Sequence, residues 1–391
     1  MSTTIDNKGV YIHIPFCNNI CIYCDFVSKI DGIDGQKKYV GVLLEEIESS
    51  PCEYRVMNDN TILKSDGIKP KIDSIYFGGG TPSSLYTGGI EHIIDRLREK
   101  FEVLQDCEIT VECNPESIER TKLIEYKRAG VNRISVGLQC ADDAVLKLLG
   151  RRHTTKEYIN ATKLVRDYFD NYSTDLILGL PRLNSNNSVH DIVTKSIDTV
   201  LSCEPNHISV YALKVEEGTP LERYRYKYDI ADDDCVADLY QYTVVSLSKA
   251  GFDRYEISNF CIKGCESRHN LKYWKGGDYF GFGVSSAGRH GRIMTKNTDI
   301  VDDYLLREGT EFEIVSLQEQ HNDYIMLGLR LSNGISLSEY KRLFGVDLLN
   351  DKRNEIETLI EQGLLTISDD NLFIPSQYLY VSNGIILKLL G

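Results

Sequence analysis

Three cysteines lie within eight residues near the start of the chain, in the stretch YIHIPFCNNICIYCDF (11–26). Cys17, Cys21 and Cys24 have the spacing C-x3-C-x2-C. Four thiolates would complete a tetrahedral zinc site or saturate a four-iron, four-sulfur cluster. Three thiolates leave one iron of such a cluster without a protein ligand, and that iron can accept a bidentate small molecule. The spacing therefore predicts a cluster that binds a ligand at its open iron.

A zinc site on the same thiolates is the alternative, with His13 or a distant residue as the fourth ligand. Zinc sites usually present C-x2-C pairs in duplicate, and the sequence has no second pair. Cys261 and Cys265 stand ahead of His269, and we expect this pair to be incidental. The remaining cysteines are isolated, so we expect reduced and mostly buried thiols.

Six short apolar, β-branched runs must position the cysteines and their neighbours. They occupy residues 10–16, 72–80, 108–115, 132–139, 174–181 and 207–213. Amphipathic stretches with a helical period lie between them, such as GGIEHIIDRLREKF at 88–101. Strands that alternate with helices predict an α/β fold with a parallel sheet, either open or closed into a partial barrel.

Each of these runs ends in glycine, proline, cysteine or a polar residue. In α/β barrels the functional site is assembled at the C-terminal ends of the strands. Glycine and proline in any one loop could simply make a turn, but six such ends together predict a site. Its candidate residues lie in the cysteine loop, at 78–82, 112–115, 139, 175, 179–181 and 211–212.

The cysteine loop in this strand–helix context resembles that of the radical S-adenosylmethionine (radical-SAM) enzymes. The resemblance implies a partial (β/α)6 barrel similar to a TIM barrel, and a [4Fe-4S] cluster on Cys17, Cys21 and Cys24. In that family, the methionine amine and carboxylate of S-adenosylmethionine (SAM) chelate the open iron. An electron from the cluster then cleaves the sulfonium to a 5′-deoxyadenosyl radical.

The motifs YIHIPFC, GGGTP, VECNP, RISVGLQ, LGRRH and DLILGLP narrow the resemblance to the coproporphyrinogen oxidase group. The resemblance runs from about Tyr11 through Arg289. Carboxylates can hold ribose hydroxyls, and arginine can pair with the SAM carboxylate. By the matching positions, the resemblance assigns SAM contacts to Tyr11, Gly79, Gly80, Thr81, Glu112, Gln139, Arg151, Asp175 and the backbone near Ala212.

The group contains oxygen-independent oxidases, which decarboxylate coproporphyrinogen III, and haem chaperones of the HemW-like family. The oxidases have a further cysteine two residues after the third and a longer N-terminal extension. Here that position is Phe26, and ten residues precede Tyr11. The chaperones have C-x3-C-x2-C-D-F and a downstream H-N-x-x-Y-W, which occurs here from His269 to Trp274. We therefore expect a haem chaperone without oxidase activity, and coproporphyrinogen oxidase is the alternative.

Haem and a haem-accepting protein are the partners that the resemblance implies, and a membrane respiratory enzyme is the expected acceptor. Imidazole is a common axial ligand of haem iron, so His269 is a candidate haem contact. Tyr273 and Trp274 could stack on a porphyrin face. The alternative is that His269 hydrogen-bonds a loop and the two aromatic rings fill the core.

The pattern changes after about residue 300, which predicts two domains, 1–300 and 301–391. Residues 318–331, 336–344 and 348–363 predict three helices, 364–374 predict a hairpin that turns at Asp369–Asn371, and a last helix lies near 378–390. This order resembles a winged helix. From Gln318 onward there are six Lys and Arg against ten Asp and Glu, which favours a packing module over a DNA reader. Residues 51–72 are polar and predict a surface insertion.

The charge and hydropathy pattern narrows the class of protein further. The formal net charge is −14, which repels nucleic acid phosphates and argues against nucleic acid binding. No apolar run approaches the roughly 18 residues of a spanning helix. The first residues, MSTTIDNKG, do not resemble a signal peptide. We therefore expect a cytoplasmic protein that does not span a membrane.

Overall fold

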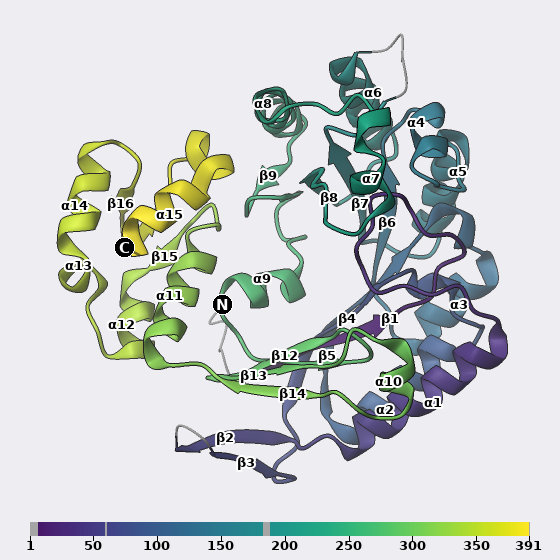
Figure 1. Cartoon of the computed structure of the whole chain (residues 1–391), viewed down its shortest axis with the longest axis horizontal. Helices are drawn as coiled ribbons and strands as arrows, with labels where there is room; N and C mark the ends of the chain where they lie inside the picture. Colours follow the sequence, from purple (N-terminus) through teal and green to yellow (C-terminus); the bar gives the residue numbers. More distant parts are fainter. Residues whose placement is uncertain (1–6, 59–60, 183–187, 391) are drawn as a thin grey trace.

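The computed structural model describes residues 7–58, 61–182 and 188–390. Six parallel strands form its centre, in the spatial order β1-β4-β5-β6-β7-β8 (Figure 1). They are β1 Lys8–Ile14, β4 Lys71–Gly79, β5 Glu102–Cys113, β6 Arg133–Gln139, β7 Tyr172–Leu178 and β8 His207–Ala212. All six predicted strands are confirmed, and each pairs in parallel with its neighbour. Residues 1–6, which carry part of the signal-peptide argument, lie outside the described residues.

Helices follow the parallel strands along the chain and cover the outside of the curved sheet (Figure 1). Their apolar faces supply the core together with the strands. For example, α2 buries Ile90, Ile93, Ile94 and Leu97, which recur at the helical period. The helices are α1 Ile33–Ser49, α2 Gly89–Lys100, α3 Arg120–Ala129, α4 Asp143–Leu148, α5 Thr155–Arg166, α6 Val189–Ser202, α7 Pro220–Arg223 and α8 Asp233–Lys249.

Further strands extend both edges of the parallel sheet, so it stays an open partial barrel. On one edge β11 Tyr279–Phe282 pairs in parallel with β1, and three antiparallel strands follow. These are β12 Ala287–His290, β13 Ile293–Lys296 and β14 Glu311–Ile314. On the other edge β10 Asn259–Cys261 and β9 Asp253–Arg254 add two antiparallel strands. Two short helices, α9 Arg268–Trp274 and α10 Val301–Leu305, lie between these strands in the sequence.

The segment predicted as a polar surface insertion contains a two-stranded hairpin, β2 Glu53–Asn58 and β3 Thr61–Ser65. It does not join the main sheet. The ring of Tyr54 stacks on that of His290 at 4.3 Å between centroids, which anchors the hairpin to β12. Mixed burial on both faces explains why the sequence shows no clear alternation.

The C-terminal residues form a helical unit with its own hydrophobic core, which includes Ile325, Tyr340, Leu359 and Leu372. Its elements are α11 Leu317–Gly328, β15 Ile335–Ser336, α12 Leu337–Phe344, α13 Leu348–Asp351, α14 Arg353–Glu361, β16 Thr366–Ser368, β17 Asn371–Phe373 and α15 Ser382–Leu390. The predicted hairpin is present. The predicted third helix is divided at Lys352, whose φ and ψ are −115° and 35°. The division at residue 300 stays a prediction.

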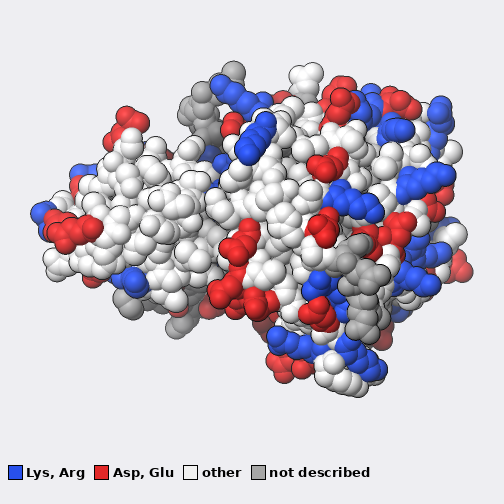
Figure 2. Space-filling model, turned by 90° about the horizontal axis from the view of Figure 1, so that it is seen from above, with Lys and Arg blue, Asp and Glu red and all other residues white. Residues whose placement is uncertain are grey.

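The surface mixes the two signs of charge. On the face in Figure 2, Lys and Arg side chains are interspersed with Asp and Glu over the barrel helices, and the C-terminal unit shows few charges. No helix among the described residues is both long and apolar enough to cross a membrane.

The barrel core should tolerate little loss of volume. We expect Leu97→Ala, at a side chain that is 0% exposed, to lower the free energy of unfolding by about 2–5 kcal/mol, because it removes buried methyl groups and leaves a cavity. The same substitution at Leu387, which is 70% exposed, should change it by less than about 0.5 kcal/mol. Urea unfolding followed by circular dichroism measures both, and equal effects would contradict this packing.

Candidate functional site

The cysteine loop leaves β1 at its C-terminal end and is closed at its base by backbone hydrogen bonds. The N–H of Cys17 donates to the carbonyl of Lys29 (3.0 Å), and the N–H of Lys29 donates to the carbonyl of Pro15 (2.6 Å). Within the loop, the N–H of Cys24 donates to the carbonyl of Cys21 (3.2 Å). This closure holds the three cysteines over the end of the sheet.

A cavity of about 480 Å³ lies between this loop and the C-terminal ends of the parallel strands. Eleven of the thirteen predicted site residues line it, and Tyr11 and His269 do not. The eleven are Cys17, Cys21, Cys24, Gly79, Gly80, Thr81, Glu112, Gln139, Arg151, Asp175 and Ala212. Residues that are far apart in the sequence therefore meet where the parallel strands end, as the strand pattern predicted.

Gly79 at the end of β4 and Gly80 just after it let the chain pass close to β1 and to the cysteine loop. Gly79 has a φ of +109°, and a Cβ on it would lie 2.7 Å from the ring of His13. A Cβ on Gly80 would lie 3.0 Å from the Sγ of Cys17. A larger residue would therefore push the loop away from the strand.

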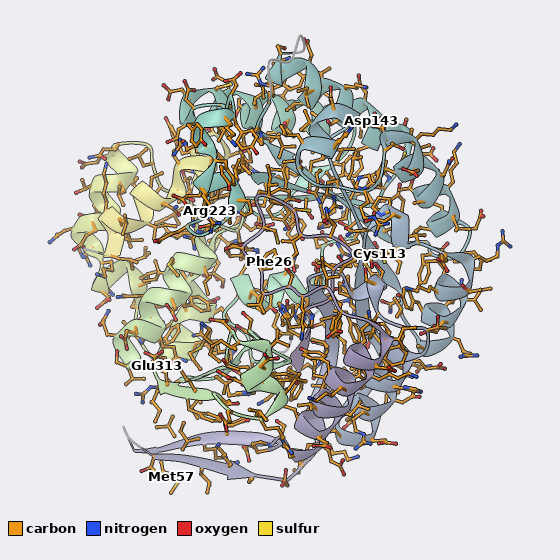
Figure 3. All side chains as sticks on the ribbon, turned by 45° about the vertical axis from the view of Figure 1, so that its right-hand side comes forward. Phe26, Met57, Cys113, Asp143, Arg223 and Glu313 are labelled. Atoms are coloured by element: carbon orange, nitrogen blue, oxygen red, sulfur yellow. The ribbon has the colours of Figure 1, made fainter. Side chains whose placement is uncertain are left out.

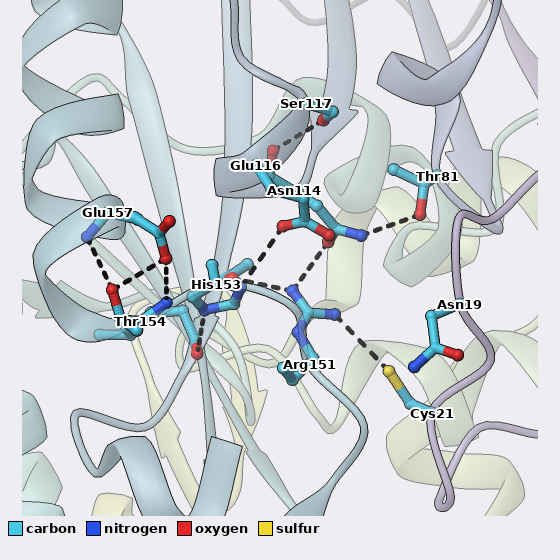
Figure 4. Close-up of polar contacts among 12 residues, drawn as sticks. Asn19, Cys21, Thr81, Asn114, Glu116, Ser117, Arg151, His153, Thr154 and Glu157 are labelled. Atoms are coloured by element: carbon cyan, nitrogen blue, oxygen red, sulfur yellow. Dashed lines mark hydrogen bonds and ion pairs between the residues drawn. The ribbon is translucent and has the colours of Figure 1, made fainter. Parts of the chain in front are cut away.

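Arg151 links the cysteine loop to two strand ends (Figure 4). Its Nη2 donates to Oδ1 of Asn114 (2.7 Å) and to the carbonyl of Gly137 (3.0 Å), and its Nη1 lies 3.9 Å from the Sγ of Cys21. Asn114 in turn donates to Oγ1 of Thr81 (3.0 Å), which lies 3.4 Å from the Sγ of Cys17. A chain of polar contacts thus joins two of the three cysteines, with a half-buried guanidinium beside one thiol.

Ser135 is a site residue that the sequence reasoning missed, and Asn114 lay within the candidate range 112–115 but was given no role. Both line the cavity. Asn114 stands in the motif VECNP one residue after β5 ends, so a polar side chain at a strand end was an available signal. Ser135 is a small polar residue inside β6 and left no such signal, because strand interiors often carry serine.

Two carboxyl groups form the polar floor of the cavity. Glu112 accepts a hydrogen bond from the Tyr76 hydroxyl (2.7 Å), and Asp175 accepts from the Ser135 hydroxyl (3.3 Å). Burial, aided by the charge of Asp175, raises the pKa of Glu112 to about 7. Burial also raises the pKa of Asp175. Such carboxyls suit a ligand whose hydroxyl groups need acceptors.

Burial raises the pKa of the Cys17 thiol, and it raises that of Cys24 to about 11. These thiols are therefore protonated at neutral pH unless a bound cation displaces the proton. Among the residues that the structure describes, no three His, Cys, Asp or Glu side chains are close enough to hold one metal ion. In a four-iron cluster each thiolate binds a different iron, whereas the thiolates of a zinc site converge on one ion.

The alternative zinc ligands are also placed elsewhere. The Nε2 of His13 donates to the carbonyl of Val27 (3.0 Å), and its Nδ1 lies 3.2 Å from the Tyr11 hydroxyl. Cys261 lies in β10, between β8 and the edge strand β9, and does not line the cavity. Neither residue adds a fourth ligand to the three cysteines in this structure.

Tyr11 and His269 lie below the cavity floor, against Tyr76. The Tyr76 ring lies between them, at 6.4 Å from the Tyr11 ring and 5.3 Å from the His269 ring. His269 is 1% exposed, with Nδ1 3.1 Å from the Ser74 hydroxyl and Nε2 2.7 Å from the Tyr273 hydroxyl. Burial lowers the pKa of His269 to about 3. As placed, this imidazole has no free nitrogen for haem iron.

Comparisons with known proteins agree with this arrangement. Residues 11–191 match the Radical SAM superfamily, and residues 315–377 match the HemN C-terminal domain. The haem chaperone HemW of Bacillus subtilis (strain 168) is 32% identical over 98% of this chain and 99% of its own. Radical S-adenosyl methionine domain-containing protein 1, mitochondrial, of Bos taurus is 30% identical over 98% of this chain and 87% of its own.

Among solved structures, coproporphyrinogen III oxidase (HemN) of Escherichia coli is similar, with a TM-score of 0.81 and 18% identity. The match covers 99% of this chain and 91% of that one, and at this identity it shows a shared fold. The full-length similarity to relatives named HemW, together with the two matched domains, shows the family. The chain belongs to the HemW-like family of the radical SAM superfamily.

Proposed function

We propose that this protein is a haem chaperone that holds a SAM-ligated [4Fe-4S] cluster, binds haem and transfers it to an acceptor protein. The observation that carries the proposal is the convergence of eleven predicted residues on one cavity, in a chain similar over its full length to haem chaperones. Phe26, at the position where the oxidases have a further cysteine, favours the chaperone over the oxidase.

Cys17, Cys21 and Cys24 would hold the cluster, which supplies an open iron for SAM and a single electron when it is bound. Arg151 lies beside the Cys21 thiol and offers a cation to the SAM carboxylate. Glu112 and Asp175 offer acceptors to ribose hydroxyls. Because Gly79 and Gly80 have no side chains, their backbone groups would be accessible to the SAM amine. Thr81, Gln139 and Ala212 complete the lining of the SAM cavity.

The proposal of haem and a haem acceptor rests on the family. Relatives named haem chaperone cover nearly the whole chain. The acceptor is expected to be a membrane respiratory enzyme, and the site of action the cytoplasm. His269 as a direct haem contact does not fit the structure, because both ring nitrogens are bonded within the fold.

The three loop cysteines should hold the iron. Replacing Cys17, Cys21 and Cys24 by alanine should abolish iron, acid-labile sulfide and the broad visible absorption after anaerobic reconstitution, because no thiolate remains in the loop. The matched control is Cys261→Ala with Cys265→Ala, which removes two thiols outside the cavity and should keep all three signals. Iron retained by the triple variant would contradict the assignment.

SAM affinity should depend on the ionisation of Glu112. With a pKa of about 7, its carboxyl is largely protonated at pH 6 and ionised at pH 8, and the ionised form accepts hydroxyl hydrogen bonds more strongly. We therefore expect SAM to bind about tenfold more tightly at pH 8 than at pH 6, and Glu112→Gln to remove this difference. Calorimetry on the cluster-bound protein measures it.

Glu357→Gln, at an exposed position on α14, serves as the control and should keep the pH dependence. If Glu112→Gln binds SAM as the parent does at both pH values, Glu112 does not contact the ligand.

Haem binding and transfer test the proposed function directly. Anaerobically reconstituted protein should bind one equivalent of haemin with a saturable shift of the Soret band, and an apo-cytochrome should then remove it. Incubation with coproporphyrinogen III and SAM should give no protoporphyrinogen. Formation of protoporphyrinogen with 5′-deoxyadenosine would establish the oxidase instead, and absence of saturable haemin binding would refute the chaperone.

A further inference from the structure

An exposed segment with the sequence LERYRYKY (residues 221–228), here called the aromatic-basic segment, lies beside the cysteine loop. The N–H of Leu221 donates to the carbonyl of Ile22 in that loop (2.8 Å). Just past its other end, Asp229 exchanges two backbone hydrogen bonds of 3.0 Å with Arg182. The segment is therefore held at both ends against the end of the barrel that carries the cavity. Figure 3 labels Arg223 in this segment and Phe26 in the cysteine loop.

Large apolar side chains are exposed on both sides of this junction. Phe26 in the cysteine loop is 64% exposed, and Tyr226 in the aromatic-basic segment is 80% exposed. Ile20, Tyr211 and Tyr224 are exposed as well, and Phe26, Ile20 and Tyr211 also line the cavity. Exposed apolar side chains that gather at one place on a protein surface mark a site of interaction.

The aromatic-basic segment also concentrates positive charge in a chain with a net charge of −14. Arg223, Arg225 and Lys227 are exposed and alternate with three tyrosines. The Nζ of Lys227 lies 4.5 Å from the centroid of the Tyr224 ring and 5.7 Å from that of Tyr226. Within the described part of the chain, no carboxylate forms an ion pair with these three cations, so they are available to an anionic ligand.

We propose that haem docks on this rim, with its propionates at the cations of the aromatic-basic segment and its ring against Tyr226 and Phe26. This inference rests on the proposed haem-chaperone function and locates the haem docking site on the chain. Haem has two apolar faces and two carboxylates at one edge, and the rim offers aromatic rings beside unpaired cations. The buried His269 lies beneath the cavity floor and offers neither.

The test uses the full chain reconstituted with its cluster and SAM, titrated anaerobically with haemin. Arg225→Glu with Lys227→Glu reverses two charges on the rim. Lys156→Glu with Lys163→Glu reverses two exposed charges on the outer face of α5 and is the matched control. We expect the rim variant to bind haemin about tenfold more weakly than the parent, as loss of two exposed charge pairs implies, and the control to be unchanged.

Haemin dimethyl ester, which lacks the propionate charges, separates the two parts of the site. The parent and the rim charge variant should bind the ester alike. A second variant, Tyr224→Ala with Tyr226→Ala, removes ring contacts and should weaken both ligands. Equal iron content and circular dichroism of all variants confirm that they are folded.

The outcomes distinguish this site from the proposed function. If the parent binds haemin and both rim variants bind it equally well, the docking site is refuted and the haem-chaperone function stands. If the parent itself shows no saturable binding, the function fails and the site with it. If the charge variant keeps its haemin affinity but loses reduction of its cluster by an acidic flavodoxin, the segment docks a redox protein and the proposal is wrong.

Discussion

Parallel pairing of β1, β4, β5, β6, β7 and β8 is the constraint on which the rest of the site depends. Because parallel strands point the same way, all six C-terminal ends open on one edge of the sheet. The cysteine loop, the glycines after β4 and the carboxylates of β5 and β7 meet there for that reason alone. The backbone closure between Cys17 and Lys29 then holds the loop above these ends.

The cavity brings several ionisable side chains together at a place where burial disfavours their charged forms. Burial raises the pKa of both Glu112 and Asp175, and the charge of Asp175 raises that of Glu112 further, while the guanidinium groups of Arg133 and Arg151 counter the effect of burial on Asp175. The thiols of Cys17 and Cys24 remain neutral in the absence of a cation. The proposed ligands would complete such a site, because a cluster would take up the thiolates and SAM would bring hydroxyls to the carboxyls and a carboxylate to Arg151.

His269 and the aromatic-basic segment lie on different sides of the cavity. The ring of His269 is a structural member of a layer beneath the site, bonded to Ser74 and Tyr273 and stacked on Tyr76, which in turn donates to Glu112. His269 and Tyr273 therefore support the cavity floor from below. The surface that suits a planar dianion lies on the opposite side of the cavity, at the aromatic-basic segment.

Much of the fold and site was determined by the sequence alone. The six strands follow from short apolar runs, and the cysteine spacing and the polar strand ends specify ten of the eleven cavity residues, because these signals are local along the chain. Arg151 came from the resemblance to the radical-SAM group alone. The roles assigned to those residues stay predictions. Only the tertiary structure decided what depends on contacts between distant segments. Asn114 bridges Arg151 and Thr81, β11 to β14 extend the sheet, and residues 51–72 contain a hairpin packed on β12. His269 has the residue type of a ligand, but its burial and its two partners are set by β4 and α9, which are separated by nearly 200 residues.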